Sequence, residues 1–265
     1  MDIERARDLS FLGVFDASRD MTRRATGGIV HDEGGVILLA GPHSLPVLIN
    51  GVARLDPALD PTDVLDRARA FFTQHKRGYT VFALAGRDDD LIAAAEAAGC
   101  IAFGDPSPLM AIEEPPAAVD TPDGMRIERV TTEEQVAALV DICADAYAVY
   151  GMPADVFPAV GSPLSILLAP HIAAYLAIDD NGPVATANSL ATHGTAYLQW
   201  VGTKQRAFGK GAGAAVTQAA TVGGFEIGAS MATLVASPMG APVYRRIGWS
   251  DVGEMVNRIA FTAPT

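Results

Sequence analysis

The chain has 265 residues, a formal net charge of −12 and a hydrophobic fraction of 49%. This length suits one large domain or two ordinary ones. The acidic balance argues against nonspecific nucleic-acid binding, which needs a basic surface, and favours a cationic partner such as an amine. No apolar run approaches the roughly 18 residues of a membrane span, and the first residues lack an apolar signal core. We therefore expect a cytoplasmic protein that makes no membrane contact.

The two cysteines, Cys100 and Cys143, are too few for a disulfide framework and lack the spacing of a metal site. Both lie in apolar stretches, as small core residues do. We expect neither disulfide nor bound metal.

The first half of the chain, residues 1–114, alternates strands and helices. The predicted strands are 36–40, 47–52, 79–85 and 109–112, and the predicted helices are 61–75 and 88–99. Between the second strand and the first helix, Arg54–Pro61 contains two prolines, which lack amide donors, and two aspartates, which repel anions. We expect no phosphate site here, and the roles left open are packing, dimerisation or a wall of a site in the second half.

Residues 115–124 are rich in proline, acidic and without periodicity, which is typical of a linker. They predict a boundary between a domain at 1–114 and a second domain at 125–265.

The second half has a more regular pattern. A capping box of Thr132 and Gln135 opens a helix after a strand at 125–130. The segment 146–169 has little periodicity. Further strands are predicted at 172–178, 184–191, 197–203, 232–236 and 253–261, with a helix from about 212 to 223.

A glycine-rich turn separates the strand 197–203 from this last helix. Gly209, Gly211 and Gly213 keep side chains away, so bare backbone N–H groups and the helix N-terminus can face an anion. Lys204 and Lys210, two of the three lysines in the chain, flank the turn. The pattern predicts a pyrophosphate cradle. A Walker loop is excluded because no hydroxyl residue follows Lys210, and a dinucleotide fingerprint needs a different glycine spacing.

The segment resembles motif A of the GNAT superfamily, the Gcn5-related N-acetyltransferases. Val201-Gly202-Thr203 matches the V-x-T strand end of that motif. The matching loop is Phe208-Gly209-Lys210-Gly211-Ala212-Gly213, in which Phe208 replaces the usual Arg or Gln. A second register, Arg206–Gly211, restores the arginine but breaks the usual distance from Val201, so we prefer the first.

A second resemblance follows in the family's order. The strand 232–236 is followed by Ser237-Pro238, expected to cap and begin a helix, and by Pro242-Val243-Tyr244 with Gly248-Trp249. This is similar to GNAT motif B. The family implies an α/β fold with a mixed, mostly antiparallel sheet flanked by helices. The element order of the first half echoes the second, so we expect two such domains in tandem, the first degenerate.

The resemblance also implies chemistry. The loop would hold acetyl-CoA, the backbone at Val201 would meet the thioester oxygen where its strand splays from the next, and Tyr244 would protonate the CoA thiolate. Ser237 would orient the pantetheine or Tyr244, or act only as a helix cap. The acceptor would be the primary amine of a small molecule or peptide, and a homodimer is the prior for such enzymes.

The general base stays open. Gln199 occupies the neighbourhood where many relatives have a carboxylate, which leaves His193, Asp251, Glu254 or a water chain, while an amine that binds neutral needs no strong base. Two other functions remain: a non-catalytic protein that binds CoA or acyl-CoA, and an interaction module with an empty loop.

Overall fold

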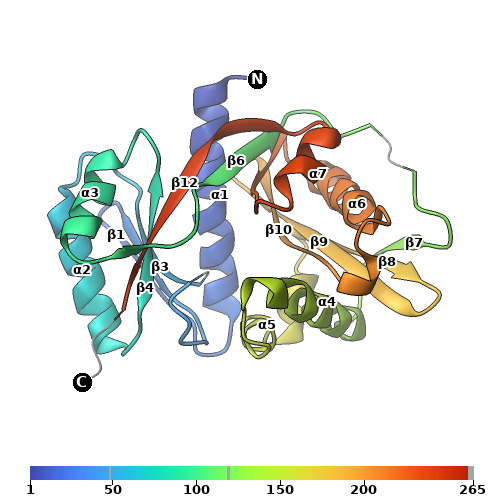
Figure 1. Ribbon diagram of the computed structural model, residues 1–265, viewed down its shortest axis with the longest axis horizontal. Coiled ribbons are helices and arrows are strands. Elements are labelled where there is room, and N and C mark those ends of the chain that lie inside the picture. Colours follow the sequence, from blue (N-terminus) through green and yellow to red (C-terminus); the bar gives the residue numbers. More distant parts are fainter. Residues whose placement is uncertain (48, 118–119, 262–265) are drawn as a thin grey trace. The chain divides into compact units, whose positions relative to one another are not determined.

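The computed structural model describes residues 1–47, 49–117 and 120–261. The chain forms two compact units. Unit 1 contains Met1–Ala17 and Leu109–Val252, and unit 2 contains Ser18–Pro108 and the chain from Gly253 onward. Each unit is a sheet with helices packed on it (Figure 1). Among the described residues, no helix combines the length and the apolar character needed to cross a bilayer.

The sheet of unit 1 has the order β6-β11-β10-β9-β8-β7. The β10–β11 pair is parallel and the pairs β6–β11, β9–β10, β8–β9 and β7–β8 are antiparallel, which confirms the predicted mixed, mostly antiparallel sheet. The strands are β6 (Ser107–Ile112), β7 (Arg126–Arg129), β8 (Ile172–Asp179), β9 (Gly182–Thr192), β10 (Thr195–Thr203) and β11 (Met231–Val235).

Helices cover both faces of this sheet (Figure 1). The capping box predicted at Thr132 and Gln135 is present at the start of α4. Apolar side chains that alternate along β10 pack towards opposite helices, which is why the strand is buried on both sides. One face carries α6 (Ala212–Glu226) and α7 (Ala241–Arg246), and the other carries α4 (Glu133–Tyr147), η1 (Ala148–Tyr150), α5 (Val156–Val160) and η2 (Leu164–Leu168).

Unit 2 contains the strands β1-β2-β3-β4-β12 in this order, with β5 on β12. Its core joins buried side chains of β2, β3 and β4 to those of two helices, with Phe72 stacked on Tyr79 at 4.4 Å. The elements are β1 (Ile29–Glu33), β2 (Val36–Ala40), β3 (Asn50–Arg54), α2 (Pro61–Gln74), β4 (Tyr79–Leu84), α3 (Asp89–Ala97), β5 (Ile101–Ala102) and β12 (Ser250–Ala260). Residue 48 of the predicted strand 47–52 lies outside the described residues.

The two units repeat one pattern. In unit 1, β10 leads through a loop into α6 and returns as the parallel neighbour β11. In unit 2, β3 leads through a loop into α2 and returns as the parallel neighbour β4. The tandem arrangement that the element order predicts is therefore present.

The last strand of each half of the chain pairs with a strand from the other half. β6 ends the first half of the chain, but it pairs with β11, with Ala111 opposite Thr233. β12 ends the second half, but it pairs with β4, with Asn257 opposite Phe82. The units therefore differ from the predicted ranges 1–114 and 125–265. Sequence patterns identify a strand but not its partner, so this exchange was not foreseen.

The predicted linker 115–124 forms no helix or strand among its described residues, and residues 118 and 119 lie outside them. Ala117 still has a partner, because its carbonyl oxygen accepts a hydrogen bond from Gln218 on α6.

The N-terminal helix α1 (Ile3–Arg24) was not predicted. Asp2 accepts a hydrogen bond from the backbone N–H of Arg5 and so caps its start. Phe11 is fully buried, and a side chain at Gly13 would lie 3.1 Å from the hydroxyl of Thr233 on β11. The first part of α1 is thus a component of the core of unit 1.

This exchange predicts that the second half cannot fold alone. A fragment of residues 113–265 lacks β6 and α1, so it loses the fully buried Phe11, Leu109 and Met110 and exposes the edge of β11. These three side chains alone contribute about 5–9 kcal/mol, comparable with the whole stability of a domain. We expect the fragment to show no cooperative thermal unfolding by circular dichroism, and co-expression with residues 1–112 to restore it. A fragment that unfolds cooperatively near the melting temperature of the full chain would contradict the prediction.

Candidate functional site: a splayed strand pair and a glycine loop

The parallel ladder between β10 and β11 is short. It pairs Thr195 with Met231 and ends where Tyr197 meets Thr233, although β10 continues to Thr203. This early end is the splay that the resemblance predicts.

A β-bulge lies in the unpaired part of β10. Against β9, Gln199 pairs with Asn188 and Gly202 pairs with Thr186, so Trp200 and Val201 together stand opposite one residue. Trp200 has φ +53°, a left-handed conformation that costs a bulky residue about 1–2 kcal/mol.

Side-chain packing holds the bulge in place. The ring of Trp200 packs edge-on against Phe157 of α5 with centroids 5.4 Å apart. The backbone carbonyl oxygen of Trp200 accepts a hydrogen bond from the thiol of Cys143 at 3.6 Å. After the bulge, Val201 packs against the apolar clusters beneath α6 and α7. Gly202 faces α4, where an added Cβ would lie 3.1 Å from Ala146.

The three loop glycines have different physical reasons. Gly209 and Gly211 have φ +74° and +83°, the left-handed region that favours glycine. Gly213 is required by close approach, since a Cβ there would lie 2.9 Å from the hydroxyl oxygen of Thr203. Gly211 is the N-cap of α6 and supplies no side-chain cap. The first amides of α6 are therefore the donors that an anion would satisfy.

Two of the basic residues near the loop are already paired. Lys204 lies 2.6 Å from a carboxylate oxygen of Asp141, and Arg206 lies 2.6 Å from one of Asp179. The bond with Arg206 lowers the pKa of Asp179. Lys210 forms no ion pair within the described residues, so it is the loop's available cation. Phe208, the departure from the family pattern, is exposed.

Tyr244 lies in the same apolar cluster that Val201 packs against, so the structure brings these two predicted site residues together. Its ring packs over Gly240, where a Cβ would lie 2.9 Å from the ring. Burial, reinforced by the nearby Tyr150, raises the pKa of Tyr244. The phenol therefore stays protonated throughout the neutral range.

Ser237 positions the helix that carries Tyr244, but it is not the residue that directly precedes that helix. α7 begins at Ala241 with Gly240 as its N-cap, so the expected Ser237-Pro238 cap pair is corrected to a preceding turn. The Ser237 hydroxyl accepts a hydrogen bond from the Gly240 N–H at 3.1 Å. It also accepts one at 3.2 Å from Tyr150 of η1, a residue that sequence reasoning missed.

Two of the candidate general bases, His193 and Asp251, interact with other charged side chains. His193 lies in the hairpin turn before β10, and Val201 is eight positions further along the chain, about 26 Å away in an extended strand. Its imidazole lies 3.4 Å from Asp16, so the structure contradicts His193 as the base. Asp251 is held by two hydrogen bonds from Arg245, at 2.8 and 2.9 Å. Glu254 belongs to unit 2.

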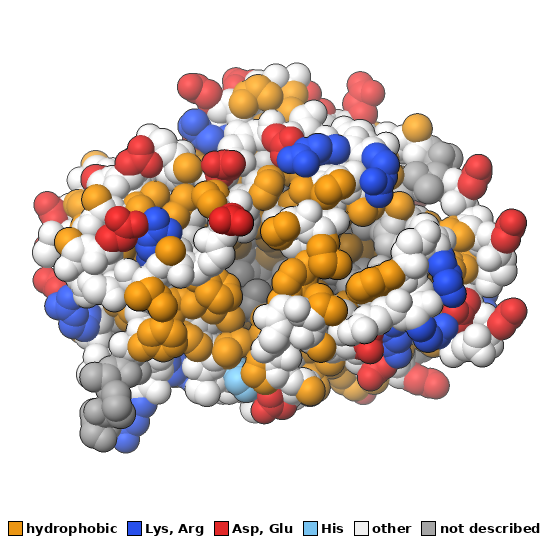
Figure 2. All heavy atoms as spheres, viewed as in Figure 1, with side chains coloured by type: hydrophobic (Ala, Val, Ile, Leu, Met, Phe, Trp, Pro, Cys, Tyr) orange, Lys and Arg blue, Asp and Glu red, His pale blue; other side chains and the backbone are white. Residues whose placement is uncertain are grey.

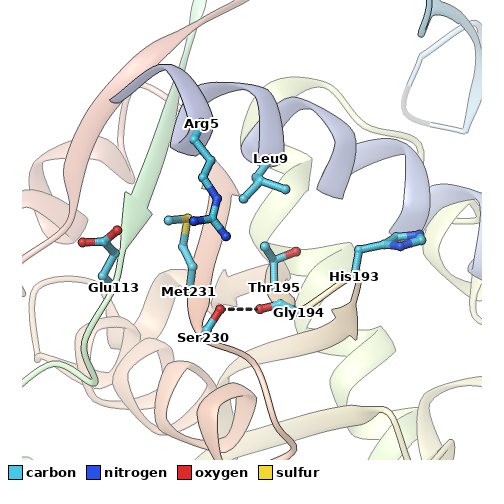
Figure 3. A pocket seen from close by; sticks show the side chains of 8 residues that line it. All are labelled: Arg5, Leu9, Glu113, His193, Gly194, Thr195, Ser230 and Met231. Carbon is cyan, nitrogen blue, oxygen red and sulfur yellow. Dashed lines mark hydrogen bonds between the residues drawn. The ribbon is translucent and has the colours of Figure 1, made fainter. Parts of the chain in front are cut away.

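A pocket of about 270 Å³ lies beside this hairpin turn, at the opposite end of β10 from the glycine loop. The side chain of Arg5 points into it, while His193 points away (Figure 3). It has no part in the site built around Val201. Its lining residues are Arg5, Leu9, Glu113, His193, Gly194, Thr195, Ser230 and Met231.

The matching position of unit 2 is filled. Arg54 ends β3 and is 1% exposed. Its guanidinium donates five hydrogen bonds, which reach Asp88, Asp90 and the carbonyl oxygen of Leu59 in the loop before α2. A side chain with its own carboxylate partners thus occupies the end of the strand that in unit 1 leads into the glycine loop.

The bulge makes a testable prediction about Trp200. At an ordinary strand position a glycine variant is less stable than an alanine variant, but at φ +53° this order of stability reverses. We expect Trp200→Gly to be about 1 kcal/mol more stable than Trp200→Ala in urea unfolding. The same pair of changes at Leu198, a regular position of β10, is the control and should show the ordinary order. Equal behaviour at the two positions would mean that the bulge is absent.

No protein-family model matches the sequence, and no curated protein matches it significantly. Solved structures do match. A GCN5-related N-acetyltransferase from Kribbella flavida is 22% identical with a TM-score of 0.70, over 95% of this chain and 96% of that one. Another from Sphaerobacter thermophilus is 17% identical with a TM-score of 0.65, over 98% and 93%.

A tandem GNAT protein from the clavulanic acid biosynthesis pathway is 15% identical with a TM-score of 0.61, over 100% of this chain and 97% of that one. Identities this low establish the fold alone. The chain therefore has the fold of the Gcn5-related N-acetyltransferases, in its tandem form.

Proposed function

We propose that the chain is an N-acetyltransferase that transfers an acetyl group from acetyl-CoA to a primary amine. The observation that carries this proposal is the combination in unit 1 of a splayed, bulged β10 with an uncapped, glycine-rich start of α6. The structural neighbours named as N-acetyltransferases support it. One of the two units does the chemistry, since Arg54 fills the matching place in the other.

In this proposal different residues of unit 1 bind acetyl-CoA and polarise its thioester carbonyl. The backbone of Gly209–Gly213, with Val201, Gly202 and Thr203 at the strand end, holds the pyrophosphate and the pantetheine arm. Lys210 adds positive charge at the loop. The backbone N–H of Val201 polarises the thioester carbonyl, where a hydrogen bond strengthens as negative charge develops on oxygen.

Attack by the amine nitrogen then forms an N–C bond and breaks the C–S bond. Tyr244 donates its proton to the departing thiolate, and Ser237 positions α7, which carries Tyr244.

The charge of the protein suits a small-molecule or peptide amine and opposes a nucleic acid. The net charge is −12, and Figure 2 shows acidic side chains spread over the viewed face with basic ones among them. We place the protein in the cytoplasm, and a homodimer stays a prediction.

A non-catalytic protein that binds CoA is the second candidate. It is favoured by Phe208, which replaces the usual Arg or Gln, and by the pairing of Arg206 with Asp179. The two variants below separate it from the enzyme.

The loop is tested with a matched pair at Gly209. Asn and Asp both tolerate its left-handed φ, and an added Cβ there meets nothing within 4 Å. Gly209→Asn and Gly209→Asp should therefore lose similar stability. Only the aspartate repels a bound pyrophosphate, so we expect it to weaken acetyl-CoA binding by at least about tenfold, or 1.4 kcal/mol, relative to asparagine in calorimetry. Equal affinities would place the cofactor elsewhere, and no binding by the wild type would make the loop a simple turn.

Catalysis is tested at Tyr244. We expect Tyr244→Phe to lower kcat by about a hundredfold or more while acetyl-CoA affinity is kept. Burial raises the pKa of Tyr244, and a proton donor is lost only as pH rises through its pKa. The wild-type rate should thus show no alkaline decline from this group below about pH 10.

The control for this test is Tyr79→Phe, another buried tyrosine, whose pKa is raised to about 12 but which lies in unit 2. It should leave the rate unchanged. An unaltered rate in Tyr244→Phe would assign the proton to another donor. No turnover in either the wild type or the variant would favour the non-catalytic protein.

A further inference from the structure

Two amide side chains lie next to each other on the face of the sheet opposite the glycine-loop helix. Gly202 faces α4, as its distance to Ala146 shows, and Thr186 is its antiparallel partner. Antiparallel partners point to the same face, and residues two apart along a strand do so as well. Asn188 therefore faces α4, and so does Gln199, its partner on β10.

Both amides have polar atoms without a hydrogen-bond partner among the described residues. Asn188 is fully buried, and neither its amide nitrogen nor its amide oxygen has a hydrogen-bond partner among the described residues. The amide nitrogen of Gln199 is also buried and without a partner there. Buried polar groups in native proteins are almost always hydrogen-bonded, so such a pair indicates a polar ligand or an ordered water.

The surroundings of this amide pair are aromatic. The ring of Trp200, next to Gln199, packs on Phe157, and Phe157 packs on Tyr147 of α4 with centroids 4.9 Å apart. Tyr147 continues this group to Tyr150, which is largely exposed. This aromatic group therefore runs from Trp200, the residue that follows Gln199, to the exposed Tyr150.

These surroundings are also poorly solvated. Burial is the main reason that the pKa of Tyr147 is raised, and the other groups that act on it are Cys143, Tyr244, Tyr197 and Tyr150. The pKa of Tyr197 is likewise raised by burial and by Tyr244. The carboxylates in the second half of α4 have other partners: Asp141 pairs with Lys204, and Asp145 accepts a hydrogen bond from the backbone N–H of Gln205.

We propose that the acceptor is an aromatic primary amine, uncharged at physiological pH, whose NH₂ group is bound by Asn188 and Gln199. This inference rests on the proposed transferase function. An alkylamine is protonated at neutral pH, like lysine, and would enter this site as an unpaired buried cation, which is strongly disfavoured. An aromatic amine is neutral, stacks against aromatic walls, and needs no general base before it attacks.

The reaction balances without a carboxylate. The amine lone pair attacks the thioester carbonyl carbon, an N–C bond forms, and the C–S bond breaks with its electron pair on sulfur. Tyr244 gives its proton to that sulfur. The nitrogen then releases one proton, which restores the phenol, so the products are an N-aryl acetamide and CoA. The amide oxygens of Asn188 and Gln199 accept hydrogen bonds from the amine N–H groups and orient its lone pair.

The test uses two isomers that differ in basicity, 4-methylaniline and benzylamine, after acetyl-CoA binding has been measured by calorimetry. We expect kcat/KM for 4-methylaniline to exceed that for benzylamine by at least about tenfold near pH 7, because benzylamine is almost entirely protonated there, like lysine. Between about pH 6 and 9 the rate with 4-methylaniline should stay flat, while any rate with benzylamine rises about tenfold per pH unit. If acetyl-CoA binds but benzylamine is the better acceptor near pH 7, the inference is overturned although the proposed function stands. If acetyl-CoA does not bind, the proposed function itself fails.

Variants then assign the preference to the two amides. Gln199→Glu replaces an amide with a carboxylate of the same shape, which can pair with an ammonium group, so the isomer preference should shift towards benzylamine by about tenfold or more. Asn188→Leu should lower kcat/KM for 4-methylaniline and leave acetyl-CoA affinity unchanged. The control is Ser189→Ala on the opposite face of β9, where the Ser189 hydroxyl bonds to Ala220 of α6. It should leave the isomer preference unchanged. If Gln199→Glu and Asn188→Leu also leave the preference unchanged, the amides hold only an internal water and the inference is wrong.

Discussion

The functional arrangement of unit 1 depends on the point at which β10 stops pairing with β11. The ladder ends at Tyr197, where the strand is still buried, and burial raises the pKa of the Tyr197 phenol. Three residues later the bulge at Trp200 shifts the alternation of β10, so that Gln199 faces α4 and Val201 faces α6 and α7. A single irregularity separates the face that would hold the acyl donor from the face that would hold the acceptor.

The two units show what such an opening costs. At the end of β3, Arg54 is buried and satisfied by Asp88, Asp90 and a loop carbonyl, and removing one partner of such a pair costs about 3–5 kcal/mol. At the end of β10, the corresponding strand leads into bare helix amides and glycines that add no apolar burial. The exchange of β6 and β12 ties each half of the chain to the unit built mainly by the other half. The first half of the chain therefore supplies a strand, β6, to the sheet of unit 1.

Much of the fold could be predicted because its signals are local. The capping box at Thr132, the glycines before α6 and the alternation of apolar strands each act within a few residues. The candidate site residues Val201 and Tyr244 could be proposed for the same reason, since each lies in a contiguous motif. What was missed depends on distant partners. β6 and β12 read as strands whatever they pair with, and the left-handed Trp200 is stabilised by Phe157 rather than by its own type. The roles of Asn188 and Tyr150 need a register and a side-chain contact that no spacing reveals.

The two units differ in how their polar groups are satisfied. On one side of the splay, the first amides of α6 have no side-chain cap, and on the other side the amide of Asn188 has no partner among the described residues. Each such group lowers stability by about 1–3 kcal/mol until something binds it. A fold can keep such unsatisfied polar groups where ligand binding offsets their cost in stability. Where no ligand binds, the groups are satisfied within the protein. The five hydrogen bonds of Arg54 are the second outcome, and in our proposal the splayed end of β10 is the first. The same strand–loop–helix backbone would then serve as structure in one unit and as a binding site in the other.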